Sequence, residues 1–256
     1  MTDAEARARR TGPRELSVTV TPRYRLMRLA ARLVTGALFD VHPDGGELWP
    51  DAPFQLVCNH HSGWDPILVI AVTPATPRIT WFGPREADFG RGFKNRVMAF
   101  IGGVIPFDPA HTSLVSAVRA VRRVFEASGV LGIFAEGRVG FRESELLTFE
   151  DGAIAFATAS GVPIVPCAIV GSSELWFRSR VRVRFGEPIP TSGVRGAAAR
   201  AELESRVRAS MSALLPDKEP PLARRRPLAW LGELLDGDDD RARHQADRRL
   251  RARSTG

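Results

Sequence analysis

The sequence has very little cysteine and no long apolar run. Its 256 residues include two cysteines, Cys58 and Cys167, each inside a short apolar stretch. This excludes a disulfide framework and a cysteine-based zinc site, and it fits a reducing compartment. No stretch approaches the roughly 18 consecutive apolar residues that a membrane-spanning helix needs, and the first residues are too polar for a secretory signal peptide. We therefore expect a soluble or peripherally bound cytoplasmic protein.

Acidic residues are outnumbered, which gives a formal net charge of +7 and a sequence pI of about 10.7. Residues 1–32 alone carry eight arginines against three acidic residues. A basic terminus favours a polyanionic partner, such as nucleic acid, an anionic membrane or a phosphorylated substrate. The alternative is that arginine and alanine simply fill solvent-exposed positions. We expect no nucleic-acid partner, because the sequence lacks an aromatic and basic stacking platform and a groove-reading helix.

Short apolar runs alternate with helical patterns along most of the chain. The sequence contains no internal repeat of roughly 20 to 50 residues, the length typical of solenoid and propeller proteins. This alternation predicts one α/β domain with a largely parallel, twisted sheet flanked by helices. We expect strands at 54–58, 78–82, 102–107, 129–135, 162–170 and 181–185, and helices at 66–72, 112–128, 151–160 and 196–214.

The two ends of the chain differ from this middle part, which we expect to form a domain over residues 21–215. Residues 1–20 are polar and are expected to be a flexible lead-in. An amphipathic helix is expected at 22–39, with Arg25, Arg28 and Arg32 at helical spacing on one face. Such a helix either packs its apolar stripe on the domain or lies in a membrane interface. Residues 216–256 form a proline-rich linker, a short apolar helix candidate and a mixed-charge tail that we expect to be disordered.

Three polar segments follow predicted strands: NHHSGWD at 59–65, DPAHT at 108–112 and EGRVG at 136–140. In an open α/β sheet, functional groups gather on the loops that leave the carboxyl ends of the strands. We therefore expect these three segments to converge on one site.

Asp65 and the two histidines before it are candidates for acid–base chemistry. The Asp65–Pro66 pair favours a helix start, with Asp65 as the N-cap. A carboxylate that caps with one oxygen can accept an imidazole N–H with the other, and a histidine held in this way has a fixed tautomer and can act as a general base. Spacing alone leaves His60 and His61 both open. Adjacent histidines in an extended loop point in opposite directions, so we expect no metal site. Ser62 lacks the strand–turn–helix signature of a nucleophile.

The segment after the 129–135 strand is a candidate for anion binding. Gly137 allows a close approach of the backbone, and Arg138 offers a planar fork for a phosphate or carboxylate.

These blocks together resemble the glycerolipid acyltransferase family, of the lysophosphatidate-acyltransferase type. The similarity covers roughly residues 23–215 and consists of four blocks in the family's order. Its NHxxxxD block is matched by Asn59, His60 and Asp65, its GxIPxDR block by Gly103, Ile105, Pro106 and Asp108, its FPEGR block by Phe134, Glu136, Gly137 and Arg138, and its GVPIVPVAI block by residues 161–169.

The resemblance implies a reaction and a set of roles. A fatty acyl group would pass from acyl-CoA or acyl carrier protein to a hydroxyl of a lysophospholipid or glycerolipid acceptor, with no cofactor beyond that co-substrate. His60 would be the general base and Asp65 would orient it. The resemblance also implies contact with the inner face of the cell membrane through the 22–39 helix. Substrate binding is implied for Asn59, Asp108, Glu136, Gly137 and Arg138.

The sequence departs from the family pattern at two positions. Pro109 stands where the second block usually ends in a phosphate-binding arginine, so a non-phosphorylated acceptor stays open, and Arg85 or Arg142 are candidates to replace that arginine. Ala135 replaces the usual proline of the third block.

Two other interpretations stay open at this stage. HHxxxD is also the signature of condensation and chloramphenicol-acetyltransferase-like enzymes, in which the second histidine, here His61, is the base. The chain could also be an acyltransferase fold that has lost activity and binds membrane lipid or a partner.

Overall fold

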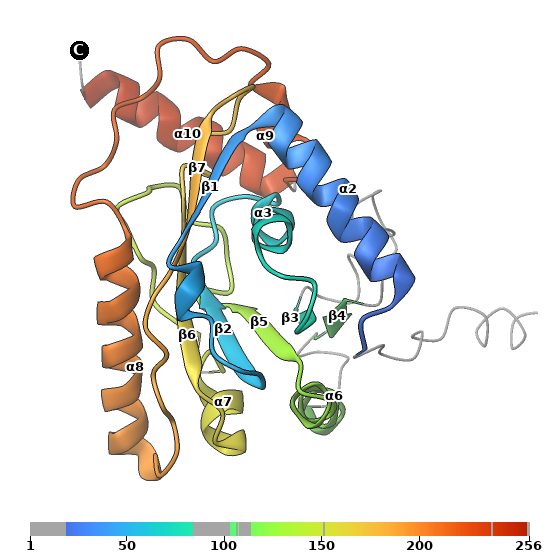
Figure 1. The fold of residues 1–256 in the computed structure, drawn as a ribbon. Helices are drawn as coiled ribbons and strands as arrows, with labels where there is room; N and C mark the ends of the chain where they lie inside the picture. Colours follow the sequence, from blue (N-terminus) through green and yellow to red (C-terminus); the bar gives the residue numbers. More distant parts are fainter. Residues whose placement is uncertain are drawn as a thin grey trace, which may run out of the picture.

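The structure is a computed structural model that describes residues 19–83, 103–105, 107, 114–150, 152–236 and 238–254. Within these residues the chain forms a seven-stranded sheet with the strand order β1-β7-β6-β2-β5-β3-β4 (Figure 1). The strands are β1 (Asp40–Asp44), β2 (Phe54–Cys58), β3 (Ile79–Phe82), β4 (Val104–Ile105), β5 (Val130–Phe134), β6 (Ile164–Val170) and β7 (Arg180–Phe185).

Most neighbouring strands are parallel, which confirms the predicted fold class of a single α/β domain. β6 and β7 form the antiparallel pair, and β1 runs parallel to β7. β2 lies between β5 and β6 and runs parallel to both, with Cys58 opposite Phe134 on one side and Cys167 on the other. The carboxyl ends of β2, β5 and β6 therefore meet at one edge of the sheet, where the segments that follow them come together.

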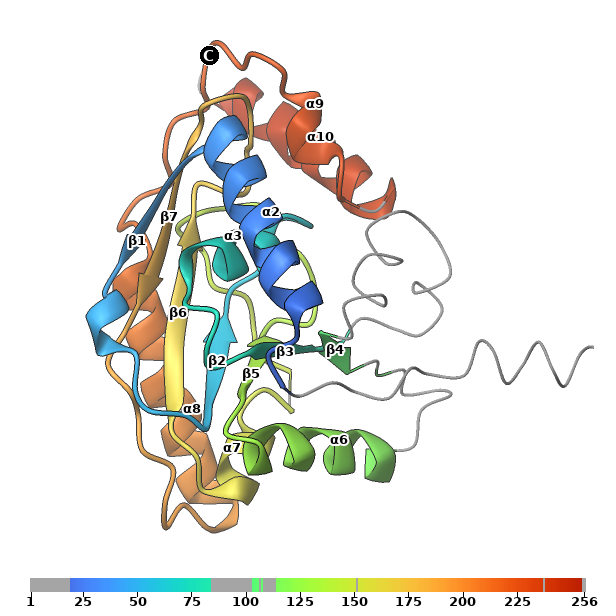
Figure 2. The ribbon, with the colours of Figure 1, turned by 45° about the vertical axis from the view of Figure 1, so that its right-hand side comes forward.

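Helices cover both faces of the sheet, so its central strands are buried on both sides. Figures 1 and 2 show α2 and α3 on one face and α8 on the other, with α9 and α10 beyond the carboxyl ends of β2 and β6. The helices are α2 (Pro22–Leu38), α3 (Asp65–Val72), α6 (Leu114–Glu126), α7 (Ala155–Ser160), α8 (Gly196–Leu214), α9 (Trp230–Glu233) and α10 (Asp238–Ser254).

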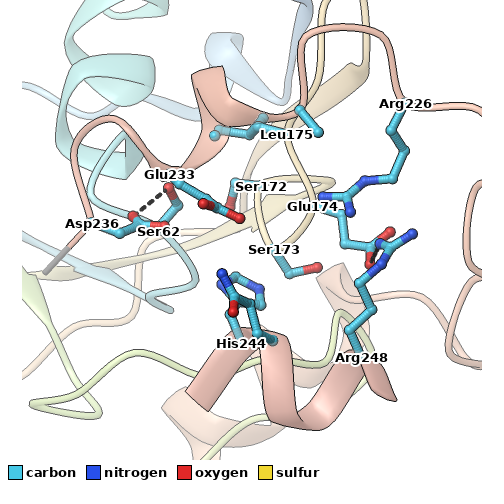
Figure 3. Close-up of a pocket in the computed structure, with 13 residues that line it drawn as sticks. Ser62, Ser172, Ser173, Glu174, Leu175, Arg226, Glu233, Asp236, His244 and Arg248 are labelled. Atoms are coloured by element: carbon cyan, nitrogen blue, oxygen red, sulfur yellow. Dashed lines mark hydrogen bonds and ion pairs between the residues drawn. The ribbon is translucent and has the colours of Figure 1, made fainter. Parts of the chain in front are cut away.

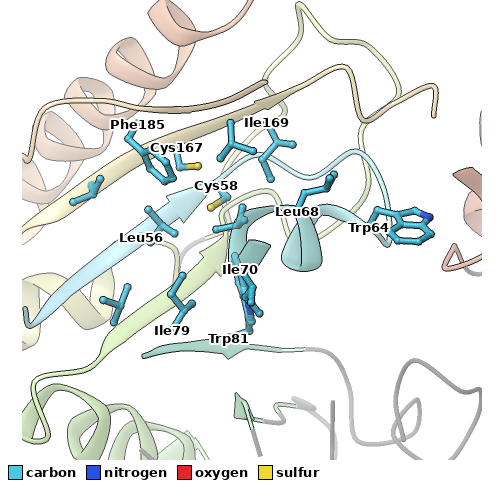
Figure 4. Packing of buried hydrophobic residues seen from close by; sticks show 14 of the residues in the cluster. Leu56, Cys58, Trp64, Leu68, Ile70, Ile79, Trp81, Cys167, Ile169 and Phe185 are labelled. Carbon is cyan, nitrogen blue, oxygen red and sulfur yellow. The ribbon is translucent and has the colours of Figure 1, made fainter. Parts of the chain in front are cut away.

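The strand pleat divides the core into two clusters. Leu56, Cys58 and Cys167 pack with Leu68 and Ile70 of α3 on one face, as Figure 4 shows. Residues that point the other way pack against α6, α7 and α8. All five residues of β2 are buried. This is the expected pattern for a strand covered on both faces, and it explains why β2 is apolar except for Gln55, whose buried side-chain amide donates to the Ala153 carbonyl.

α2 begins where the sequence predicts a helix. The Thr21 hydroxyl accepts the Tyr24 N–H at 3.2 Å, and Pro22 occupies the first helical position. Tyr24 and Ala31 face inward, while Arg28 donates to the Thr73 carbonyl at the end of α3. None of the described helices is long and apolar enough to cross a membrane.

Two elements differ from the sequence-based expectation. α10 occupies a segment predicted to be a disordered tail, and that prediction was wrong. This helix has almost no apolar stripe, and it docks instead through ion pairs: Arg248 with Glu174, Arg251 with Glu219 at 2.9 Å, and Asp247 with Arg142 at 3.6 Å. The other element is β1, which has no apolar alternation. It is an edge strand, where a proline such as Pro43 is tolerated. Most of the predicted lead-in at 1–20 lies outside the described residues.

Candidate active site

Asn59, the residue that follows β2, ties the centre of the sheet together. Its side-chain oxygen accepts the Ile169 N–H at 2.7 Å and its amide nitrogen donates to the Ile169 carbonyl at 3.0 Å. The side chain is fully buried. Its amide joins the end of β2 to β6 and fixes the start of the loop at 60–64, while its predicted contact with the substrate stays a prediction.

Asp65 holds this loop through one carboxylate oxygen. Oδ2 lies 2.8 Å from Nδ1 of His60, and it accepts the backbone N–H groups of His61 at 2.6 Å and Ser62 at 2.9 Å. Asp65 is the first residue of α3 rather than its N-cap, and Oδ1 is buried without a hydrogen-bond partner among the described residues. The predicted cap role is thus corrected, because the carboxylate bonds to the loop before the helix.

The ring of His60 is fixed by stacking as well as by Asp65. It lies parallel to the Phe134 ring at a centroid distance of 4.1 Å, and Phe134 stacks on Trp81 at 4.7 Å. Gly132 leaves space for these stacked rings, since a Cβ atom at this position would lie 2.6 Å from the Trp81 ring. The His60 side chain is 21% exposed. Because Nδ1 faces a carboxylate, the proton is favoured there, and Nε2 is left with the lone pair that a base needs.

Glu136, in the segment that follows β5, binds the backbone of His60. Its side chain is 1% exposed, and its two oxygens accept the backbone N–H groups of His60 at 3.4 Å and Leu147 at 3.2 Å. Burial raises the pKa of Glu136, against the opposing effect of His61 and these N–H groups. Glu136 therefore supports the backbone of His60, and its predicted contact with the substrate stays a prediction.

Gly137 and Arg138 lie in the turn after Ala135. Gly137 has a φ of +61°, and a Cβ atom there would lie 2.6 Å from the Glu150 side chain, so the turn requires glycine. Arg138 is exposed and makes no ion pair or hydrogen bond to the described residues. Of the other residues considered for phosphate binding, Arg142 pairs with Asp247 of α10. Asp108, Pro109 and Arg85 lie outside the described residues.

His61 is bound to a second carboxylate, that of Glu143, at 3.5 Å. Both are buried, and Glu143 also accepts the N–H groups of Gly171 and Ser173, each at 2.8 Å. Burial disfavours the charge on His61, but Glu143, with Asp65 and Glu136, outweighs it and raises the pKa of His61 to about 9.

Burial likewise disfavours the charge on Glu143, but His61 and the two N–H groups lower the pKa of Glu143 to about 2. His61 is therefore a buried cation at neutral pH, which argues against it as a base in the HHxxxD interpretation. Sequence reasoning missed Glu143, because a single acidic residue in a loop has no local pattern that identifies its partner.

The other side of the loop contacts the segment around α9. The Ser62 hydroxyl donates to Oδ1 of Asp236 at 3.1 Å, and the Gly63 N–H donates to the same oxygen at 2.7 Å. Figure 3 shows Ser62 and Asp236 at the rim of a cavity of about 40 Å³, with His244 of α10 on its far side. Because the Ser62 hydroxyl points to Asp236, it does not form a nucleophile–base pair with His60. Sequence reasoning also missed Asp236, since it lies in the segment predicted as linker and tail.

The described residues thus bring His60, Asp65, Glu136 and Arg138 to one edge of the sheet, with a single partly exposed histidine among buried polar groups. No group of three or more His, Cys, Asp or Glu side chains in the described part of the chain is arranged to hold a metal ion. This arrangement suits a histidine that removes a proton from a bound hydroxyl group.

Three comparisons place the chain among known proteins. The family model described as "Acyltransferase" matches residues 41–170. A curated relative, 1-acyl-sn-glycerol-3-phosphate acyltransferase of Bacillus subtilis (strain 168), is 26% identical over 145 residues, which are 54% of this chain and 68% of the relative. The crystal structure of the 1-acyl-sn-glycerophosphate (LPA) acyltransferase PlsC from Thermotoga maritima has a TM-score of 0.58 and 18% identity over 84% of each chain, a likeness of fold.

The His61–Glu143 pair predicts a specific pH dependence of stability. The pKa of His61 in the folded protein, about 9, is above its ordinary value of 6.5. The charged His61 therefore stabilises the fold fully below pH 6.5, and this contribution is lost as the pH rises through 9. The pKa of Glu143 in the folded protein, about 2, is below its ordinary value of 4.5. The contribution of the Glu143 carboxylate to stability is therefore present above pH 4.5 and is lost as the pH falls through 2.

Urea unfolding at pH 6.5 and 9.5 measures this effect against a matched variant, His61→Gln with Glu143→Gln. We expect the difference in unfolding free energy between the parent and this variant to shrink by on the order of 2 kcal/mol from pH 6.5 to 9.5. An unchanged difference would show that His61 is not the buried cation.

Proposed function

The chain belongs to the glycerolipid acyltransferase family, and on that premise we propose that it transfers a fatty acyl group from a thioester donor to the hydroxyl of a 1-acylglycerol-3-phosphate-type acceptor. The donor is acyl-CoA or acyl carrier protein. The observation that carries the proposal is the partly exposed His60, whose Nδ1 is bound to a buried carboxylate at 2.8 Å. The acceptor class is supported by the names of the two relatives.

In the proposed mechanism His60 moves one proton. Nε2 takes the proton of the acceptor hydroxyl while the hydroxyl oxygen attacks the thioester carbonyl and forms the new C–O bond. The tetrahedral intermediate then collapses, the C–S bond breaks, and the departing sulfur takes the proton back from His60. Asp65 stabilises the imidazolium between these steps, because its Oδ2 accepts the Nδ1 proton.

Arg138 is the candidate that binds the acceptor phosphate. It is exposed on the turn after β5, at the same edge of the sheet as His60, and none of the described carboxylates pairs with it. A guanidinium fork can form two charge-assisted hydrogen bonds to a phosphate, which favours a phosphorylated acceptor.

α2 is the candidate that contacts the inner face of the cell membrane. Its inward face packs on α3, while Leu26, Leu29 and Leu33 are 68%, 52% and 65% exposed along its outer face. Arg25 and Arg32 are exposed next to these leucines. Apolar side chains beside cationic ones are typical of a helix that lies in an anionic membrane interface.

Removing the proposed base tests the reaction. We expect His60→Ala to lower kcat by about 10²–10⁴-fold, since general-base catalysis contributes roughly that much. Thiol release is measured with acyl-CoA and acyl carrier protein as donors, and with lysophosphatidate and monoacylglycerol as acceptors. The matched control is His42→Ala, an exposed histidine of β1, which should keep full activity. If the parent turns over no donor, the chain is an inactive acyltransferase fold.

The phosphate role of Arg138 is tested by the choice of acceptor. We expect Arg138→Ala to raise KM for lysophosphatidate by about 10–100-fold, the worth of charge-assisted hydrogen bonds, and to leave KM for monoacylglycerol unchanged. Arg119→Ala removes an exposed arginine of α6 and serves as the control. An equal effect of Arg138→Ala on both acceptors would assign the phosphate to another residue.

Membrane contact through α2 is tested by sedimentation with vesicles that contain phosphatidylglycerol. We expect Leu29→Glu with Leu33→Glu to weaken binding at least about tenfold, because carboxylates replace apolar area and repel the anionic surface. Leu250→Glu changes a comparably exposed leucine of α10 and should bind like the parent. Equal binding of all three proteins would place the contact elsewhere.

A further inference from the structure

Two carboxylates, Asp65 and Asp236, accept the backbone N–H groups of residues 61–63, and only Asp65 belongs to the sequence motif. Asp65 accepts the N–H groups of His61 and Ser62. Asp236 accepts the N–H of Gly63, and the Ser62 hydroxyl accepts the N–H of Trp64 at 3.2 Å. All four backbone N–H groups from His61 to Trp64 therefore have acceptors, and two of the four depend on Asp236 directly or through Ser62.

Ser62 connects Asp236 to the start of α3. A hydroxyl has one proton and two lone pairs, so its orientation depends on the acceptor that takes its proton. The proton goes to Asp236 Oδ1 at 3.1 Å, which leaves a lone pair for the Trp64 N–H. Trp64 directly precedes Asp65. Through its contact with Ser62, which Figure 3 shows, Asp236 thus fixes the backbone at the residue before the carboxylate that orients His60.

The backbones of the two segments also fit closely against each other. A Cβ atom on Gly63 would lie 2.1 Å from the Leu235 carbonyl oxygen, so this contact requires glycine. The Trp64 indole N–H donates to the Leu231 carbonyl at 2.8 Å, and the indole ring packs edge-on against Phe39 at 5.2 Å. Gly63 is thus explained by the approach of residues 231–236 and not by the turn of its own loop.

We infer that Asp236 is a positioning residue for His60, and that residues 231–236 are part of the active site although they lie outside the matched family region. This inference rests on the proposed function for its kinetic consequence. Without Asp236, the Gly63 N–H loses its acceptor and the Ser62 hydroxyl is free to rotate. The backbone before Asp65 then moves, and with it the carboxylate oxygen that Nδ1 of His60 needs.

A role in stability alone would give a different result, and the chain offers a control for it. α10 is also anchored by Arg251, which pairs with Glu219 at 2.9 Å and donates to the Pro220 carbonyl at 2.9 Å. Arg251→Ala therefore loosens the contact of α10 with residues 219–220 and leaves the hydrogen bonds of Asp236 to Ser62 and Gly63 in place.

The kinetic experiment compares Asp236→Ala, Asp236→Asn and Arg251→Ala with the full-length parent, with rates normalised to folded protein by circular dichroism. We expect Asp236→Ala to lower kcat about 10–100-fold, the effect of a small misplacement of a catalytic group, with KM for both substrates within twofold. Asp236→Asn keeps an acceptor oxygen and should stay within about threefold of the parent, as should Arg251→Ala. A kcat within twofold for Asp236→Ala, or an equal loss in Arg251→Ala, would overturn the inference.

A second measurement does not depend on activity. The ¹⁵N signals of the His60 ring report its tautomer by NMR, and we expect the Nδ1–H form in the parent, in Asp236→Asn and in Arg251→Ala. Asp236→Ala should show a mixture of tautomers. If the tautomer changes as expected while no substrate is turned over, the proposed function fails and the positioning role stands. An unchanged His60 spectrum in Asp236→Ala would refute the positioning role itself.

Discussion

The site depends on a single buried oxygen atom, Oδ2 of Asp65. It accepts hydrogen bonds from a side chain and from two backbone N–H groups at once, at 2.6 to 2.9 Å. Three donors give this buried oxygen the hydrogen bonds that it would otherwise lose on leaving water. They also close the loop between β2 and α3 into a compact turn, so that the orientation of His60 and the path of the chain have the same cause.

Around this atom the polar side chains form a support for one partly exposed histidine, His60. Asn59 binds β6, Glu136 binds the backbone of His60, and Glu143 binds His61 together with the loop after β6. Each of these groups is buried and bonded, as buried polar groups must be if they are not to cost stability. Because β2 lies between β5 and β6, the three loops that supply these groups reach the same place.

Much of the fold and part of the site could be predicted from the sequence, as far as the signals are local. The described strands other than β1 and most described helices follow from apolar runs and their spacing. The His60–Asp65 pair follows from a motif whose two residues are five positions apart, and both kinds of signal are local. The internal hydrogen bonds of Asn59 and Glu136 could not be predicted, because a motif shows which residues matter and not which way their side chains face. The roles of Glu143 and Asp236 and the helix α10 were not predicted, because their partners lie far away in the sequence. Ser62 and Asp236, for example, are 174 positions apart.

The contact between Gly63 and Leu235 has a consequence for the order in which the protein matures. During synthesis the loop at 60–64 leaves the ribosome well before residues 231–236, at rates of roughly 5–20 residues per second. All strands of the described sheet precede the second segment in the chain. The sheet can therefore assemble before Ser62 and Gly63 have their acceptor on Asp236, and the loop that carries His60 gains these hydrogen bonds only when the later segment docks. The sheet of a nascent chain can thus be complete before the loop at 60–64 is fully held in place.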